Sequence, residues 1–195
     1  EENDIKNYLS YLTSNKHYKP RSLNLALSSL KFFYNNVMNK KITENIKSPK
    51  LDKKIPVILN SEEIKSLLNA ITNPKHKILI SLMISSGLRI SEAVSVKIND
   101  INFEEKTLKI KNEKGNKERI TIISGKLLEE IKFYIAKRKD NNPYLFQIRD
   151  THVTIKLPQK IIKETAKKAN LNKNVHCHTL RSTFANLLTD NGVSN

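Results

Sequence analysis

The sequence predicts a mainly α-helical protein with one small antiparallel β-sheet, arranged as a short helical N-terminal domain, a linker and a larger second domain. Three observations lead to this fold class. Apolar residues recur at helical spacing along most of the chain, apolar and polar residues alternate only at 107–123, and a lysine- and proline-rich segment separates two helical regions. Since 195 residues have room for one or two domains, we place domains at 1–46 and 60–195 with a linker at 47–59.

The N-terminal domain is predicted from two amphipathic helices. Residues 4–14 repeat apolar side chains at helical spacing, and a second apolar stripe extends from Leu23 to Val37. Pro20 precedes this stripe, and proline is favoured in the first turn of a helix. Lys31 lies off the stripe. Because two helices bury little surface, we interpret this region as a small helical domain or as part of one.

The linker differs sharply in composition from its surroundings. Residues 47–59 contain two prolines and four lysines, among them Lys53 and Lys54. Such a segment is extended rather than helical. Its lysines could follow a phosphate backbone or could keep a tether solvated, and composition alone does not distinguish the two.

The second domain begins with a helix N-cap. Asn60 and Glu63 have the spacing of a capping box, and an apolar helical stripe follows them. Pro74 opens the next helix, which is apolar on most sides between residues 78 and 84 and is therefore expected at the centre of the core. Gly87 is predicted to end that helix as a left-handed cap.

Strands are predicted in one place. Leu108 and Ile110 alternate with lysines, Ile120 and Ile122 alternate with polar residues, and residues 112–116 form a turn between them. This pattern is typical of a β-hairpin. The other helices of this domain are predicted from about Ser91 and at about 126–139, 158–170 and 178–191.

Charge and cysteine content limit the function. The chain has 35 Lys and Arg residues against 19 acidic residues, a net charge of +16. This excess favours a polyanionic partner, because a lysine or arginine set against a phosphate releases condensed counterions; solubility is the other interpretation. Cys177 is the single cysteine, which excludes an intramolecular disulfide and fits a reducing cytoplasm. No apolar stretch approaches the ~20 residues of a membrane span, so no membrane partner is expected.

Three clusters of basic residues could carry chemistry. Arg89 follows a predicted helix end with Glu92 three residues further on, and Lys114 lies at the hairpin tip. His178 and Arg181 are spaced i and i+3 on a helix and so share a face. Taken singly, each cluster has an ordinary explanation as a surface ion pair, a solvated turn lysine or an exposed helix start.

A metal site was also considered at the third cluster. His176, Cys177 and His178 are all potential ligands. Adjacent residues at a helix start point apart, however, and no fourth ligand is evident. We therefore predict no metal.

Together, the three clusters resemble the tyrosine recombinases of the phage-integrase family, and the Xer type most closely. The matching segments are GLRISE at 87–92, EKGNKER at 113–119 and HTLRSTFA at 178–185, in the family's order. Each motif alone is moderately specific, whereas the ordered set is very specific. The resemblance extends from about Tyr8 to Asn195, and it implies a tyrosine-recombinase catalytic domain preceded by a partial helical core-binding domain.

The resemblance also implies a reaction, in which a tyrosine hydroxyl attacks a DNA phosphodiester to give a 3′-phosphotyrosyl link and a free 5′-hydroxyl. It needs no cofactor, because the bond energy is kept in the covalent intermediate. Without a metal, the pentacoordinate phosphorane needs fixed cations, and the resemblance assigns Arg89 and Arg181 to that task. Lys114 is then expected to protonate the leaving 5′-oxygen, and His178 to assist proton transfer or to bind the phosphate. Glu92 is interpreted as the acid that orients Arg89.

Double-stranded DNA is the partner that charge and resemblance both predict. Members of the family work as tetramers that hold two duplexes, so we expect a homotetramer in the synaptic complex and a monomer in free solution. The candidate DNA contacts outside the catalytic set are Lys31, Lys53, Lys54, Lys117 and Arg119.

The chain departs from the family at the nucleophile. All six tyrosines precede Arg181, whereas the nucleophile of the family follows it. We therefore expect the nucleophile beyond Asn195, in a C-terminal segment of the catalytic domain that these 195 residues lack, and we expect these residues alone to be inactive for cleavage.

Two other functions agree with part of these observations. A natural relative without the tyrosine would only bind DNA, but the presence of Arg89, Lys114, His178 and Arg181 favours the enzyme, because a binder needs phosphate contacts and not this constellation. A type IB topoisomerase shares the chemistry, although the Xer-like motifs and the short hairpin favour a recombinase.

Overall fold

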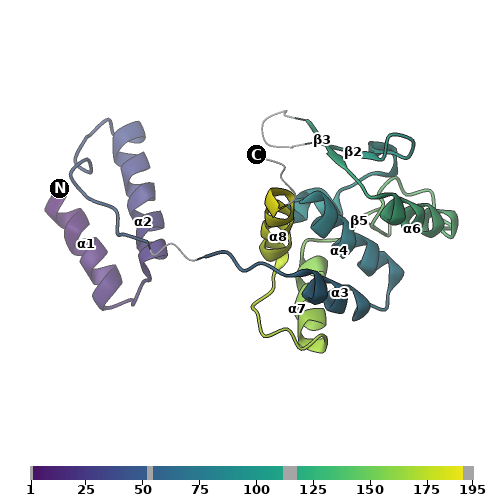
Figure 1. Cartoon of the computed structure of the whole chain (residues 1–195). Coiled ribbons are helices and arrows are strands. Elements are labelled where there is room, and N and C mark those ends of the chain that lie inside the picture. The colour runs from purple at the N-terminus through teal and green to yellow at the C-terminus, as the bar shows by residue number, and fades with distance from the viewer. Residues whose placement is uncertain (1, 52–54, 112–117, 191–195) are drawn as a thin grey trace. The chain divides into compact units, whose positions relative to one another are not determined.

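The computed structural model describes residues 2–51, 55–111 and 118–190. The chain divides into two compact units, Glu1–Ile55 and Pro56–Asn195, which are described separately (Figure 1). Within the described ranges, no helix has both the length and the apolar composition that crossing a bilayer requires.

The first unit contains α1 (Glu2–Ser14), α2 (Pro20–Phe32) and a π-helical turn, η1 (Phe33–Val37), that continues α2. Its small core is formed by buried apolar side chains from both helices and from the segment that follows them. Those buried side chains are Ile5, Leu27 and Ile46, with Leu9, Leu30, Tyr34 and Ile42 packed against them.

The π-helical turn corrects one detail of the predicted stripe. The stripe was expected to extend to Val37, but this side chain is 59% exposed. In η1 the amide of Met38 bonds to the carbonyl of Phe33, five residues back, at 3.0 Å. Each such turn contains an extra residue, which rotates the following side chains off the helical stripe.

The second unit begins as the local signals predict. Helix α3 (Ser61–Asn69) has the predicted capping box, with the amide of Glu63 donating to Asn60 Oδ1 and the amide of Asn60 donating to Glu63 Oε2, both at 2.8 Å. Helix α4 (Pro74–Ser86) is buried along most of its length. It ends at Gly87 in the left-handed conformation, with φ 58°, which confirms the predicted cap.

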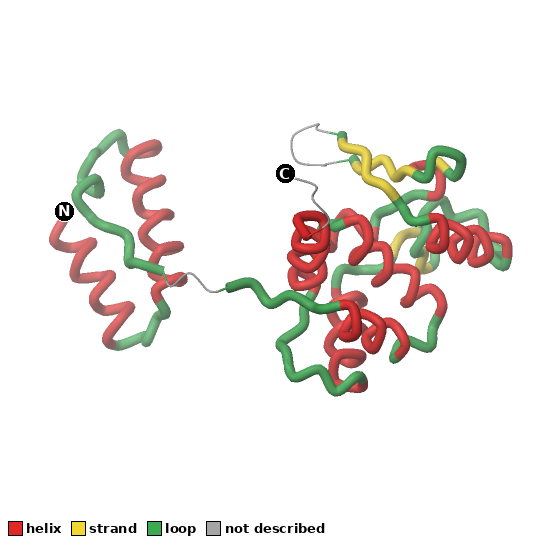
Figure 2. The backbone as a smooth tube through the Cα atoms, in the orientation of Figure 1, coloured by secondary structure: helices red, strands yellow, loops and turns green. Residues whose placement is uncertain are grey.

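Helix α4 forms the centre of this unit. It contacts α3, α5 (Ile90–Val94), α6 (Gly125–Ala136), α7 (Lys156–Lys168) and α8 (Cys177–Asp190). In the backbone trace the helices make up the bulk of the unit, and the longest strands lie along its upper edge (Figure 2). The predicted helices are therefore all present, with ends that differ by a few residues.

The predicted hairpin is also present. Strands β2 (Thr107–Ile110) and β3 (Arg119–Ile122) pair antiparallel, with Thr107 opposite Ile122 and Ile110 opposite Arg119. The predicted turn at 112–116 lies outside the described residues. A two-residue strand, β1 (Ile101–Asn102), adds to β2 after the 3₁₀ turn η2 (Ile98–Asp100).

A second, two-stranded sheet pairs β4 (Gln147–Ile148) with β5 (Thr151–His152). The prediction of a single sheet was therefore incomplete. Two residues show no measurable alternation, so β1, β4 and β5 could not have been found from periodicity.

Candidate active site

Arg89 stands at the junction between two helices. Gly87 ends α4 and Leu88 is buried behind it, while Arg89 takes the extended N-cap position of α5. The chain therefore turns outward at Arg89, whose side chain lies at the surface with 53% of its area exposed.

The buried side chain of Glu92 bonds to both the backbone and the side chain of Arg89 at this junction. Its side chain is only 5% exposed, and its carboxylate accepts four hydrogen bonds. Arg89 donates two of them, from its amide to Oε2 at 2.7 Å and from Nη1 to Oε1 at 2.9 Å. Arg119 donates the other two, from Nη1 to Oε1 at 2.8 Å and from Nη2 to Oε2 at 2.7 Å. Each oxygen thus has two partners, which satisfies the acceptor capacity of a carboxylate.

The pKa of Glu92 reflects these contacts. Burial acts to raise it, but the hydrogen bonds from Arg119 and Arg89 and the charge of Arg119 outweigh burial and lower the pKa from its ordinary value of 4.5 to about 2. The reciprocal contact raises the pKa of Arg119. Glu92 is therefore ionised at every pH at which the fold is expected to function.

A pH-dependent loss of stability follows from the lowered pKa of Glu92. The pKa of Glu92 is lower in the folded protein than in the unfolded one, where it is near 4.5. The ionised carboxylate therefore stabilises the fold above about pH 4.5, and this stability is lost as the pH falls toward 2. The contribution is at most roughly 3 kcal/mol. We expect the free energy of unfolding of wild type to exceed that of Glu92→Gln at neutral pH, with the difference shrinking below about pH 4.5 in urea titrations. A difference that stays constant down to about pH 2.5 would contradict this assignment.

Arg181 enters the same site from α8, which packs against α4. Its Nη1 donates to the carbonyl of Gly87, so the residue that ends α4 also holds this arginine. The pKa of Arg181 is lowered by burial and then by the nearby charges of Arg89 and Arg119, with Glu92 acting in the opposite sense. Three arginines and one carboxylate therefore share this region, an arrangement that favours a bound anion.

A cavity of about 500 Å³ opens between α5 and the start of α8. Arg89, His178 and Arg181 all line it, so the structure brings together three of the residues proposed from the sequence. The other lining residues are Leu88, Ile90, Ser91, Gln159, His176 and Cys177.

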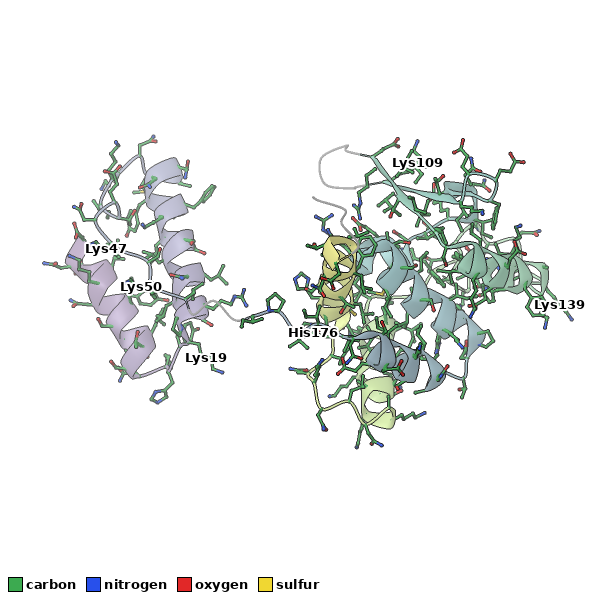
Figure 3. All side chains as sticks on the ribbon, in the orientation of Figure 1. Lys19, Lys47, Lys50, Lys109, Lys139 and His176 are labelled. Carbon is green, nitrogen blue, oxygen red and sulfur yellow. The ribbon has the colours of Figure 1, made fainter. Side chains whose placement is uncertain are left out.

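The residues considered for a metal site serve other purposes. His176 lies beside the start of α8 (Figure 3). Its Nδ1 atom accepts a hydrogen bond from the amide of Thr179 at 3.1 Å and so caps that helix. Burial raises the pKa of Cys177 to about 11, so its thiol stays protonated. Across the described ranges, no group of three or more His, Cys, Asp or Glu side chains is arranged to hold a metal.

The other residues proposed from the sequence are distributed as follows. Four of them, Lys53, Lys54, Lys114 and Lys117, lie outside the described residues. Lys31 is partly exposed in the last turn of α2, in the first unit. Arg119, also proposed as a DNA contact, pairs with Glu92.

Two of the tyrosines in the second unit, Tyr134 and Tyr144, have structural partners. Tyr134 donates its hydroxyl to Gln147 at 3.0 Å, and burial raises its pKa. The ring of Tyr144 lies edge-on to His152, with 4.9 Å between ring centroids. Neither lines the cavity that contains Arg89 and Arg181.

The pairing of Arg119 with Glu92 is the feature of the site that sequence reasoning missed. The two residues are 27 positions apart and meet only because β3 packs beside the end of α4. Gln159 was missed for the same reason, since it reaches the cavity from α7. No local pattern distinguishes either residue from an ordinary surface side chain.

Two protein-family models match the sequence. Residues 58–195 match the phage integrase family, and residues 1–44 match the N-terminal SAM-like domain of phage integrases. The two matches fall within the two compact units.

Named relatives agree with these matches. The chain is 37% identical over 180 residues to the tyrosine recombinase XerA of Pyrococcus horikoshii, an alignment that covers 90% of this chain and 62% of that protein. It is 34% identical over 196 residues to XerA of Pyrococcus furiosus, covering 97% of this chain and 68% of the relative. The chain thus spans 62% of the length of the first of these relatives.

Solved structures show the same likeness. The crystal structure of a XerA recombinase superposes with a TM-score of 0.65 at 27% identity, covering 98% of this chain and 70% of that one. The XerH site-specific recombinase bound to its difH substrate, in a pre-cleavage complex, gives a TM-score of 0.76 at 26% identity, covering 98% and 60%.

Proposed function

Because this chain belongs to the phage integrase family, the tyrosine recombinases, we propose that it is part of a site-specific recombinase that cuts and rejoins double-stranded DNA through a 3′-phosphotyrosyl intermediate. The observation that carries the proposal is the convergence of Arg89, His178 and Arg181 on one cavity. These three residues come from two motifs that lie far apart in the sequence.

The charges of the site suit a phosphodiester. Glu92 neutralises one of three clustered arginines, which leaves an excess of positive charge for the phosphate and for the charge that grows on the phosphorane. The bonds given above for Arg89 and Arg181 each involve one terminal nitrogen, Nη1. Further guanidinium donors of each arginine can therefore bind phosphate oxygens in a fixed, planar geometry.

The proton transfers are assigned by motif and by position. His178 lines the cavity on the same helix face as Arg181, where it can hydrogen-bond the phosphate or assist proton transfer. Lys114 is proposed as the general acid for the leaving 5′-oxygen, because an alkoxide is a poor leaving group without a proton.

The remaining parts of the proposal concern organisation. We assign residues 1–46 to a core-binding domain, 47–59 to a linker and 60–195 to the catalytic domain. Lys31, Lys53, Lys54 and Lys117 are the proposed backbone contacts, and a homotetramer is proposed for the synaptic complex. A cytoplasmic location is also part of the proposal, supported by the single cysteine.

Binding to duplex DNA is expected to weaken steadily as salt rises. Contacts between lysine or arginine and phosphate release counterions, so the logarithm of affinity should fall linearly with the logarithm of salt concentration. Fluorescence anisotropy with a labelled duplex measures the slope, and sedimentation measures whether the free chain is a monomer. An affinity that does not change between low and moderate salt would argue against a DNA partner.

A suicide substrate tests the enzyme against the binding-only alternative. The 195 residues alone are expected to bind DNA without forming a covalent adduct, because Tyr134 and Tyr144 are held away from the arginine cavity. A chain extended with the native codons that follow Asn195 is expected to form a denaturation-resistant adduct. An extended chain that binds but never links to DNA would favour the binding-only relative, and an adduct with the 195 residues would show that a tyrosine was wrongly dismissed.

A further inference from the structure

The guanidinium of Arg119 is directed at the buried carboxylate of Glu92. Arg119 is the first residue of β3, and its two terminal nitrogens both bond to the carboxylate of Glu92. Its side chain is 36% exposed, whereas that of Glu92 is 5% exposed. A bidentate ion pair with a buried carboxylate fixes the plane of the guanidinium, and the two N–H groups that form it do not bind a phosphate.

We propose that Arg119 is a positioning residue that acts through Glu92 to hold Arg89 in the orientation that meets the scissile phosphate. The inference rests on the proposed function, in which Arg89 binds that phosphate. It replaces the assignment of Arg119 as a contact to the DNA backbone.

The division of bonds at Glu92 gives the physical reason. Arg119 occupies one acceptor site on each carboxylate oxygen, so the side chain of Arg89 bonds to Oε1 alone and its amide takes the remaining site on Oε2. If Arg119 were absent, two acceptor sites on a buried carboxylate would lose their partners, which is costly. The flexible side chain of Arg89 could then close onto both oxygens, and its donors would be withdrawn from the phosphate.

The strand that carries Arg119 is itself anchored to the end of α4. Ser86 Oγ donates to the carbonyl of Ile122 at 3.2 Å, and Thr121 Oγ1 donates to the carbonyl of Ser86 at 3.5 Å. Ser86 directly precedes Gly87, the residue whose carbonyl holds Arg181. Arg119 therefore acts from a rigid element that is joined to the same helix end as both proposed catalytic arginines, as a positioning residue requires.

The guanidinium signals of Arg89 in ¹⁵N nuclear magnetic resonance spectra of the 195-residue chain test the proposal directly. We expect Arg119→Gln and Glu92→Gln each to shift and broaden the Arg89 Nε–Hε signal, and the double variant to resemble Glu92→Gln, because both changes break one chain of contacts. Arg119→Lys keeps the charge but lacks the two-pronged geometry, so it should not restore the signal. Lys109→Gln, on the neighbouring strand β2, is the matched control and should leave it unchanged.

The salt dependence of DNA binding separates positioning from direct contact. Loss of a phosphate contact lowers the slope of affinity against salt by about one. In Glu92→Gln the support of Arg89 is already broken, so the double variant Glu92→Gln with Arg119→Gln should have the same slope as Glu92→Gln alone. An unchanged Arg89 signal in folded Arg119→Gln, or in Arg119→Lys if the glutamine variant does not fold, would overturn the proposal. A slope of the double variant lower by about one than that of Glu92→Gln would overturn it as well, because Arg119 would then contact phosphate directly.

Neither measurement requires catalysis. An extended chain that forms no adduct would therefore contradict the proposed function, while the positioning role would still be decided by the Arg89 signal. If the extended chain is active, Arg119→Gln is expected to slow adduct formation by about tenfold to a hundredfold at saturating DNA, the scale of a misplaced catalytic group.

Discussion

Replacing Arg181 with alanine is expected to slow formation of the covalent protein–DNA adduct at least about a hundredfold in the chain extended past Asn195, equivalent to about 3 kcal/mol of transition-state stabilisation. Arg181 lies in a partly desolvated cavity, held by the carbonyl of Gly87, where its charge acts more strongly than it would in water. DNA affinity should fall far less, because many other phosphate contacts remain. Arg89→Ala should behave in the same way, since it removes the second fixed cation.

Single-turnover cleavage of a suicide substrate, with DNA in excess, measures this rate separately from binding. Lys65→Ala is a matched control, because Lys65 is an exposed lysine on α3 that forms an ion pair with its helix neighbour Glu62. It should leave both rate and affinity close to wild type. If Arg181→Ala weakened DNA binding in proportion to the rate, the arginine would be stabilising bound DNA rather than the transition state.

Gly87→Ala is expected to lower the free energy of unfolding of the second unit by about 2–4 kcal/mol. The backbone at Gly87 has φ 58°, where a β-carbon is unfavourable by roughly 1–2 kcal/mol. In addition, the new β-carbon would overlap the ring of Phe184, so that side chain or the helix α8 that carries it would have to shift. Since α8 carries Arg181, the same substitution should also reduce adduct formation.

Chemical unfolding of the 195-residue chain measures the stability part of this prediction. Gly125→Ala is the matched control, because its β-carbon would meet only Lys106 Nζ at 3.9 Å and alanine favours the helix that Gly125 begins. We expect that variant to be neutral or slightly stabilised. Gly87→Ala combined with Phe184→Leu should recover part of the lost stability, and a double variant no better than the single one would assign the whole cost to the backbone.

Local signals in the sequence determined most of the helical framework. The box at Asn60 and Glu63, the proline at the start of α4 and the glycine at its end act within a few residues of one another. They are therefore visible without knowledge of the fold. The β2–β3 hairpin was visible for a similar reason, because its two strands are long enough to alternate. The order of the three basic motifs was sufficient to name the family.

The tertiary structure alone decided how the site is held together. Arg119 and Glu92 are 27 positions apart, and Arg181 and Gly87 are 94 apart. Such pairs depend on which faces of α4, α8 and β3 pack together. The free energy of that packing comes from contacts throughout the core, so no short segment of the sequence determines it. The sequence therefore identified Arg89, His178 and Arg181 as candidates, whereas packing decided that they meet at one cavity. Packing also decided that Arg119 binds the carboxylate beneath Arg89, because a buried carboxylate must find its donors wherever the fold brings them.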